Sequence, residues 1–145
     1  FDAVLLIYRD FSALLESERD KLLELVYDSL KPGGKLFFDV SNKNEVNEKQ
    51  FTKSWSVQKD GFWSGQEHLV LEDTHYYQEE NIILKQYIII EENNVAEYQV
   101  VDKLYSVDEI TRLLKEYKQV QFYSDMCGKE IFDKTEVLAC IVTKS

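Results

Sequence analysis

The chain has 145 residues, of which 44% are hydrophobic, and 17 basic against 27 acidic side chains give it a net charge of −10. This length suffices for one domain with a buried core. So acidic a surface repels phosphate backbones, which disfavours nucleic-acid binding. No apolar run approaches twenty residues and no basic and apolar leader opens the chain, so we expect no membrane-spanning helix and no targeting leader. The expected partner is a small molecule or a protein, and the expected location is the cytoplasm.

The first forty residues predict a strand, a helix and a second strand. Ala3 to Tyr8 is a nearly unbroken apolar run, which is typical of a parallel strand buried on both faces. Ser17 is the expected helix N-cap, with Asp20 in the place of a capping-box acid. A Lys-Pro-Gly-Gly segment at 31–34 ends the helix, because proline cannot continue it and glycine accepts a positive φ. Lys35 to Val40 is the second strand, and this spacing predicts a βαβ crossover.

The middle of the chain predicts four more strands. A polar segment at 41–53, rich in Asn, Lys and Glu, comes first and is expected as a loop or a surface helix. Alternating apolar residues and the turn signals between them then predict strands at Thr52–Gln58, Gln66–Gln78, Ile82–Glu91 and Val95–Tyr105. Successive hairpins of this kind form an antiparallel meander.

The last forty residues predict a helix and a closing pair of strands. Ser106 and Glu109 form a capping box at the start of an amphipathic segment. Strands are expected at Val120–Ser124 and Glu136–Thr143. The connection between them has no helical pattern, so we expect the pair to be antiparallel.

These elements resemble a known family. The opening Phe-Asp-Ala-Val-Leu-Leu-Ile-Tyr strand, the Leu-Lys-Pro-Gly-Gly turn at 30–34 and the strand that ends at Asp39 are similar to the fourth strand, helix and fifth strand of class I S-adenosylmethionine-dependent methyltransferases, above all the small bacterial members. The resemblance implies an α/β fold: the C-terminal half of a doubly wound, Rossmann-like sheet with an inserted antiparallel β meander. Residues 1–41 and 106–145 would form the methyltransferase core, and 42–105 the inserted substrate or cap region.

One family feature has no counterpart in these residues. The family binds S-adenosyl-L-methionine chiefly at a glycine-rich loop after its first strand, and no such loop occurs here. We therefore expect the chain to be the C-terminal portion of a methyltransferase that acts on a small-molecule nucleophile. This portion alone is expected to be inactive, with S-adenosyl-L-methionine bound by the complete protein.

The expected cofactor contacts lie where the first predicted strand ends. In doubly wound sheets, ligands bind beyond the carboxyl ends of the parallel strands, here at 7–12 and 39–42. The resemblance implies that the fourth strand of the family touches the methionine part of the cofactor. Ile7, Tyr8 and Arg9 are therefore the candidate cofactor-binding residues.

The candidate substrate contacts are Asp10, Phe11 and Trp63. Asp10 could accept a proton from an attacking amine or hydroxyl, although Arg9 and Asp10 could equally form a solvated ion pair or a loop cap. Methyl transfer asks mainly for placement and exclusion of water, so no catalytic residue is assigned. Aromatic side chains of the insertion could line a pocket or pack the meander; they are Trp55, Phe62, Trp63, Tyr76 and Tyr77.

Neither the histidines nor the cysteines predict a metal site. His68 and His75 are seven residues apart in one expected strand, so their side chains point to opposite faces. Cys140 is expected in the core, whereas Cys127 has no assigned role.

Two other classes of function fit the same elements. The chain could be a non-catalytic module whose aromatic meander binds a small apolar ligand, or a protein-interaction domain on a methyltransferase-like scaffold. As the C-terminal portion of a methyltransferase, by contrast, the chain would leave its first strand without its natural neighbour. Because an unpaired apolar strand is prone to pair with another chain, self-association through it, or a residual N-terminal fragment that covers it, is expected.

Overall fold

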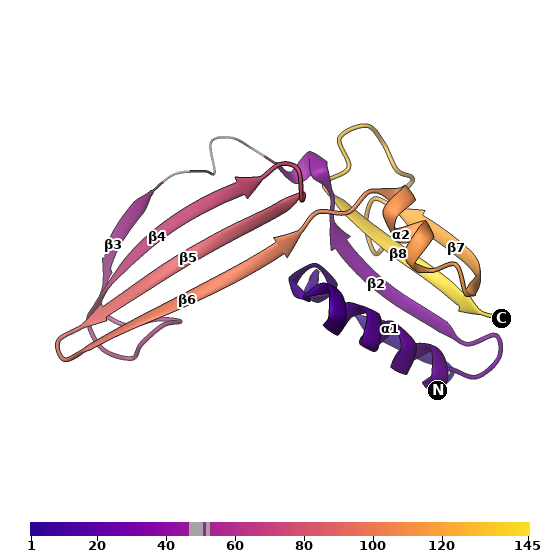
Figure 1. Cartoon of the computed structure of the whole chain (residues 1–145), viewed down its shortest axis with the longest axis horizontal. Coiled ribbons are helices and arrows are strands. Elements are labelled where there is room, and N and C mark those ends of the chain that lie inside the picture. Colours follow the sequence, from indigo (N-terminus) through magenta and orange to yellow (C-terminus); the bar gives the residue numbers. More distant parts are fainter. Residues whose placement is uncertain (47–50, 52) are drawn as a thin grey trace. The chain divides into compact units, whose positions relative to one another are not determined.

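The computed structural model shows a mixed α/β fold with two sheets (Figure 1). It describes all residues except 47–50 and 52, and also leaves the side chain of Glu45 undescribed. The chain divides into two compact units: unit 1 comprises Phe1–Val46 and Asp102–Ser145, and unit 2 comprises Asn47–Val101. No helix among the described residues is long and apolar enough to cross a membrane.

The sheet of unit 1 has four strands in the order β1-β2-β8-β7. Its strands are β1 (Ala3–Leu6), β2 (Lys35–Ser41), β7 (Tyr117–Tyr123) and β8 (Val137–Lys144). β1 pairs with β2 in parallel, and β7 pairs with β8 antiparallel. Both orientations are as predicted from the sequence.

Helix α1 (Glu16–Ser29) connects β1 and β2 and follows a short 3-10 helix, η1 (Asp10–Ala13). The prediction that Ser17 caps α1 is wrong, because Leu15 is the N-cap residue. The Glu18 carboxylate accepts a hydrogen bond from the Leu15 backbone N–H at 3.0 Å. Glu18 therefore satisfies the backbone donor at the helix start, which left no capping role for Ser17 and Asp20.

The turn that ends α1 depends on its glycines. Gly33 has a φ of +77°, a conformation that side chains other than glycine rarely adopt. A Cβ on Gly34 would lie 2.9 Å from the Lys31 carbonyl oxygen and 3.1 Å from that of Phe1. The Lys-Pro-Gly-Gly segment therefore ends the helix as predicted. The absence of a side chain at Gly34 also lets the backbone approach that of Phe1 closely.

Strand β1 is less buried than its apolar sequence predicts. It is an edge strand; Val4 and Leu6 pack on the core, whereas the Leu5 side chain is 65% exposed. The expectation of burial on both faces is therefore wrong. The residues of the described chain cover only the face of β1 that lies toward α1.

The core of unit 1 is a single cluster beneath α1 and α2 (Val107–Leu113). Ser106 and Glu109 form the predicted capping box of α2, and Cys140 is buried as expected, with Cys127 exposed. The ring of Phe11 lies 4.8 Å from that of Phe38 between centroids. The cluster comprises Phe11, Leu23, Val26, Leu30, Leu36, Phe38, Val40, Tyr105, Ile110, Leu114, Tyr117, Leu138, Cys140 and Val142.

The sheet of unit 2 has its strands in sequence order, β3-β4-β5-β6. They are β3 (Ser54–Gln58), β4 (His68–Tyr77), β5 (Ile82–Glu91) and β6 (Asn94–Lys103), whose last two residues belong to unit 1. β3, β4 and β5 pair antiparallel, and β6 runs back along β5 (Figure 1). Part of the polar segment at 41–53 forms the short 3-10 helix η2 (Lys43–Glu45), and Thr52, the predicted first residue of β3, lies outside the described residues.

The two faces of this sheet differ in what covers them. Val70, Ile83 and Ile89 are buried on one face, which we call the covered face. The cross-strand partners Trp55, Leu71 and Ile88 lie on the other, which we call the open face. Trp55 is 72% exposed there, so the alternation of side chains along each strand separates a packed surface from an unpacked one.

Candidate functional site

A left-handed turn follows β1 at the carboxyl end of the unit 1 sheet. Tyr8 and Arg9 have φ angles of 67° and 63°, which non-glycine residues adopt at a cost of about 1 kcal/mol each or more. The Arg9 backbone N–H donates a hydrogen bond to Oδ1 of Asp39 at 2.9 Å, and the Ser12 N–H donates to the Arg9 carbonyl at 2.9 Å. The end of β2 therefore holds the turn after β1 in its strained conformation.

A second set of hydrogen bonds reaches the same turn from deeper in unit 1. The Ser41 backbone N–H donates to the Ser12 hydroxyl oxygen at 2.9 Å, and the Ser41 hydroxyl donates to Oδ2 of Asp102 at 3.1 Å. Ser12 and Ser41 are both fully buried. Buried polar groups that are all paired fix one arrangement, so the carboxyl ends of β1 and β2 form a rigid platform.

The structure places the predicted cofactor contacts together on this platform. The side chain of Tyr8 is 85% exposed and that of Ile7 is 40% exposed, while Arg9 is half-buried. An exposed aromatic ring and an exposed aliphatic chain at the end of a parallel strand offer an apolar surface to a ligand. The roles of these residues in binding stay a prediction.

The predicted substrate contacts have different surroundings. Asp10 is exposed at the start of η1, beside the turn. Phe11 is only 1% exposed and packs against Phe38 and Tyr105, so its side chain supports the turn from within the core. Trp63 belongs to unit 2, where its ring lies 4.8 Å from that of Tyr87 and 5.0 Å from that of Tyr98.

Asp39 lies at the expected ligand positions 39–42, but the sequence did not predict its bond to the turn after β1. It is 9% exposed, and its carboxylate accepts the Arg9 N–H. Burial raises the pKa of the Cys140 thiol, and the nearby negative charge of Asp39 raises it further. The sequence did contain one signal, an acidic residue at the end of an apolar strand. The partner of Asp39 could not be predicted, because its carboxylate binds a backbone N–H, which every residue except proline carries.

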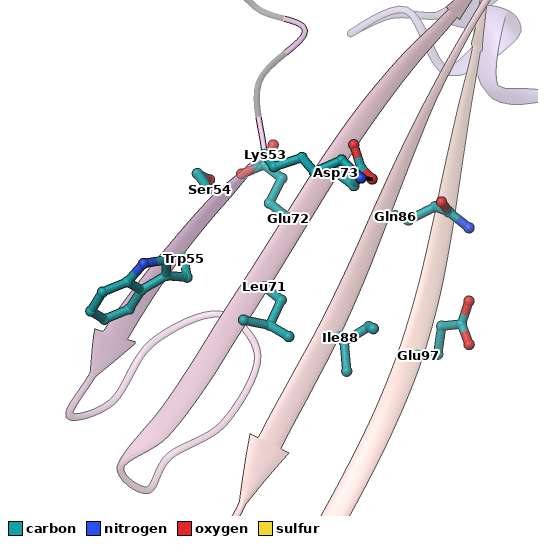
Figure 2. A pocket seen from close by; sticks show the side chains of 9 residues that line it. All are labelled: Lys53, Ser54, Trp55, Leu71, Glu72, Asp73, Gln86, Ile88 and Glu97. Carbon is teal, nitrogen blue, oxygen red and sulfur yellow. Dashed lines mark ion pairs between the residues drawn. The ribbon is translucent and has the colours of Figure 1, made fainter.

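Unit 2 contains a cavity of about 390 Å³ on its open face (Figure 2). Figure 2 shows the Trp55 indole, Leu71 and Ile88 on successive strands, with Glu97 on β6 and the Lys53–Asp73 pair beyond them. This volume lies within the range of small-molecule sites. The lining residues are Lys53, Ser54, Trp55, Leu71, Glu72, Asp73, Gln86, Ile88 and Glu97.

The histidines lie on opposite faces of β4, as predicted. His68 is 2% exposed on the covered face, where its Nδ1 lies 2.7 Å from the Gln66 carbonyl oxygen. His75 lies on the open face, with Nε2 3.2 Å from Oδ2 of Asp73. No cluster of three or more His, Cys, Asp or Glu side chains that could hold a metal ion occurs among the described residues.

Three solved structures that resemble this chain are methyltransferases. A S-adenosylmethionine-dependent methyltransferase from Clostridium acetobutylicum matches with a TM-score of 0.71 and 13% identity, over 100% of this chain and 58% of its own. The CcbJ methyltransferase from Streptomyces caelestis matches with a TM-score of 0.69 and 11% identity, over 99% and 61%. CalS10 from Micromonospora echinaspora, an amino pentose methyltransferase solved with S-adenosylmethionine bound, matches with a TM-score of 0.57 and 11% identity, over 100% and 58%.

The likeness covers this chain almost completely but spans only 58 to 61% of those three chains. No protein-family model and no curated protein matches the sequence. At 11 to 13% identity a structural likeness establishes the fold and leaves activity open. The chain therefore has the fold of the S-adenosylmethionine-dependent methyltransferases, as its resemblance to them predicts.

Proposed function

We propose that this chain is the C-terminal portion of an S-adenosylmethionine-dependent methyltransferase that methylates a small-molecule nucleophile. In this proposal unit 1 is part of a doubly wound, Rossmann-like sheet, and unit 2 is an inserted antiparallel meander. The observation that carries it is the platform at the carboxyl ends of β1 and β2, in a chain whose whole length matches methyltransferase structures. Such strand ends are where α/β sheets of this kind bind their ligands.

The exposed residues of the platform fit the proposed cofactor. S-adenosylmethionine carries a sulfonium and an ammonium group, and its sulfonium supplies an already activated methyl group. The Tyr8 ring is 85% exposed and can contact a cation through its π face. Asp10 beside it adds a carboxylate, and the net charge of −10 attracts a cationic ligand over a longer range.

In this proposal the residues of the platform act mainly by holding the cofactor and the nucleophile in position. In-line attack on a methyl group needs the two reactants held at contact distance and shielded from water. Asp39, Ser12 and Ser41 hold the turn through backbone groups, so the side chains of Tyr8 and Ile7 are presented in one orientation. Asp10 is the candidate to take a proton from an amine or hydroxyl nucleophile.

The exposure of β1 supports the part of this proposal in which a further segment of the complete protein pairs with β1. Leu5 is 65% exposed and Phe1 is 72% exposed, and β1 has a strand neighbour on one side alone within the described chain. An apolar edge strand of this kind is a site for further pairing. We infer that residues preceding Phe1 in the natural protein pair with β1 and supply the glycine-rich loop; pairing of two copies through β1 is the alternative.

The test compares the 145-residue chain with the same chain preceded by its natural upstream residues. Isothermal titration with S-adenosylhomocysteine is expected to show binding to the longer protein and none to the shorter one. In the longer protein Tyr8→Ala should weaken binding of S-adenosylmethionine, which carries the sulfonium, about tenfold, whereas Phe62→Ala, a matched exposed aromatic of unit 2, should leave it unchanged. A longer protein that does not bind S-adenosylhomocysteine would refute the proposed function.

A further inference from the structure

The open face of unit 2 is a continuous apolar surface without a covering segment among the described residues. Trp55 pairs across the sheet with Leu71, and Leu71 pairs with Ile88. The next row, Val57, Leu69 and Ile90, extends the same surface. Trp55 is 72% exposed and Val57 is 60% exposed. Contiguous exposed apolar patches on a protein surface commonly mark binding sites.

The charges around this surface are unequal. Asp73 is paired with the Lys53 ammonium at 3.0 Å and with His75 Nε2 at 3.2 Å. Glu97 lines the same cavity from β6, and its side chain forms no ion pair or hydrogen bond with any other described residue. The one lysine that lines the cavity is therefore already paired with Asp73, and Glu72 accepts a hydrogen bond from the Tyr87 hydroxyl at 3.4 Å. Glu97 places a further carboxylate beside the apolar row. An anionic ligand would therefore meet no cation there that is not already paired with a carboxylate, whereas a cationic ligand would meet the Glu97 carboxylate.

We propose that the open face of unit 2 binds a small organic cation with an apolar body, such as an aromatic or alkyl ammonium compound. The apolar body lies on Leu71 and Ile88 with the Trp55 indole at its β3 end, and the ammonium group lies toward β6, where Glu97 balances its charge. The cavity of about 390 Å³ is large enough for such a molecule. Charge complementarity favours this occupant over a neutral apolar ligand or a second copy of the chain. The proposal does not depend on methyl transfer.

Benzyltrimethylammonium is a suitable probe, with benzyl alcohol and phenylmethanesulfonate as neutral and anionic compounds of similar body. Titration of the 145-residue chain by calorimetry should show binding of the cation, at least about threefold weaker binding of the alcohol, and none of the sulfonate. Equal binding of the cation and the alcohol would overturn the role of charge. Binding of the sulfonate in preference to the cation would overturn the proposal as a whole.

Four variants locate the site. Trp55→Ala and Glu97→Gln are each expected to weaken binding of the ammonium probe about three- to tenfold. Their controls are Phe62→Ala, which removes an aromatic ring that is 89% exposed, and Glu92→Gln, which removes an exposed carboxylate of the turn before β6; both should leave binding unchanged. Equal effects in the controls would overturn the assignment to this face.

Sedimentation distinguishes the alternative in which a second copy covers the open face. The proposal predicts that Trp55→Ala does not change the sedimentation coefficient of the chain. If wild-type chains dimerise and Trp55→Ala makes them monomeric, the face is an interface between copies and the ligand proposal fails. Dimerisation that Trp55→Ala does not affect, such as pairing through β1, leaves the open face available to the probe.

Discussion

The two faces of the unit 2 sheet carry one tryptophan each, and the two are in opposite environments. On the covered face Trp63 is half-buried and its ring contacts those of Phe62, Tyr87 and Tyr98. On the open face Trp55 is 72% exposed and stands at the β3 end of the row that it forms with Leu71 and Ile88. Burial on the covered face explains how a thin antiparallel sheet holds together. It does not explain the apolar residues of the open face, which contribute little to stability as the structure stands.

Neighbouring residues of β5 test this difference most strongly. Ile89 is 3% exposed on the covered face, whereas Ile88 is 36% exposed on the open face. Ile89→Ala should lower the free energy of unfolding of unit 2 by about 3 kcal/mol, because it removes a buried side chain and leaves a cavity. Ile88→Ala should cost less than about 1 kcal/mol. Urea unfolding followed by tryptophan fluorescence measures both, since both tryptophans of the chain lie in unit 2.

Equal losses from the two isoleucine variants would mean that the open face is covered in solution. A second chain could provide that cover, and the loss from Ile88→Ala would then depend on protein concentration. Independence from concentration would point to cover from within the chain.

The two tryptophans give a smaller contrast. Trp63→Ala should destabilise unit 2 by about 2 kcal/mol, because the ring contacts three other aromatic rings but is only half-buried. Trp55→Ala should change the unfolding free energy by less than about 0.5 kcal/mol. Far-UV circular dichroism is the suitable measurement, since each variant removes one fluorescent reporter. A loss from Trp55→Ala as large as that from Trp63→Ala would contradict the assignment of the two faces.

The sequence predicted the helices and strands better than it predicted which of their faces are buried. The bounds of β5 and the capping box of Ser106 and Glu109 agree with the structure, because periodicity and capping are local properties of the chain. Alternation also separated the two sides of β4, with His68 and His75 on opposite faces. It could not tell which side would be covered, so the choice of Trp63 over Trp55 as a candidate substrate contact did not rest on which of the two is exposed.

The candidate site shows the same limit. The place of Tyr8 and Arg9 at the end of an apolar strand followed from the resemblance. The strand ends earlier than predicted, at Leu6 instead of Tyr8, and neither the left-handed conformation of Tyr8 and Arg9 nor the bond to Asp39 was foreseen. A side chain that binds a distant backbone N–H leaves no periodic signal. The Ser17 cap failed for a related reason, because an acid three residues after Leu15 offered the helix an alternative start. Burial of β1 depends on which segments cover it, and no property of its own residues fixes that.

The ion pair of Lys53 and Asp73 on the open face gives the smallest expected effect. A hydrogen bond from Lys53, together with the nearby His75, lowers the pKa of the Asp73 carboxyl below its ordinary value of 3.8. Because the folded pKa is the lower one, the carboxylate adds stability at pH values above its unfolded pKa, and this stability is lost as the pH falls through the folded value. Asp73→Asn should therefore be slightly less stable than the wild type near neutral pH, and the difference should vanish once the pH has fallen below the folded pKa of Asp73.

A double-mutant cycle with Lys53→Met isolates the pair from other effects of the same substitutions. The Lys53 side chain is 81% exposed, so the coupling should be small and should weaken as salt is added. Coupling that persists at low pH or in high salt would mean that the pair is shielded from water, and so that the open face is covered. Coupling that disappears under both conditions agrees with an open face that a cationic ligand can reach.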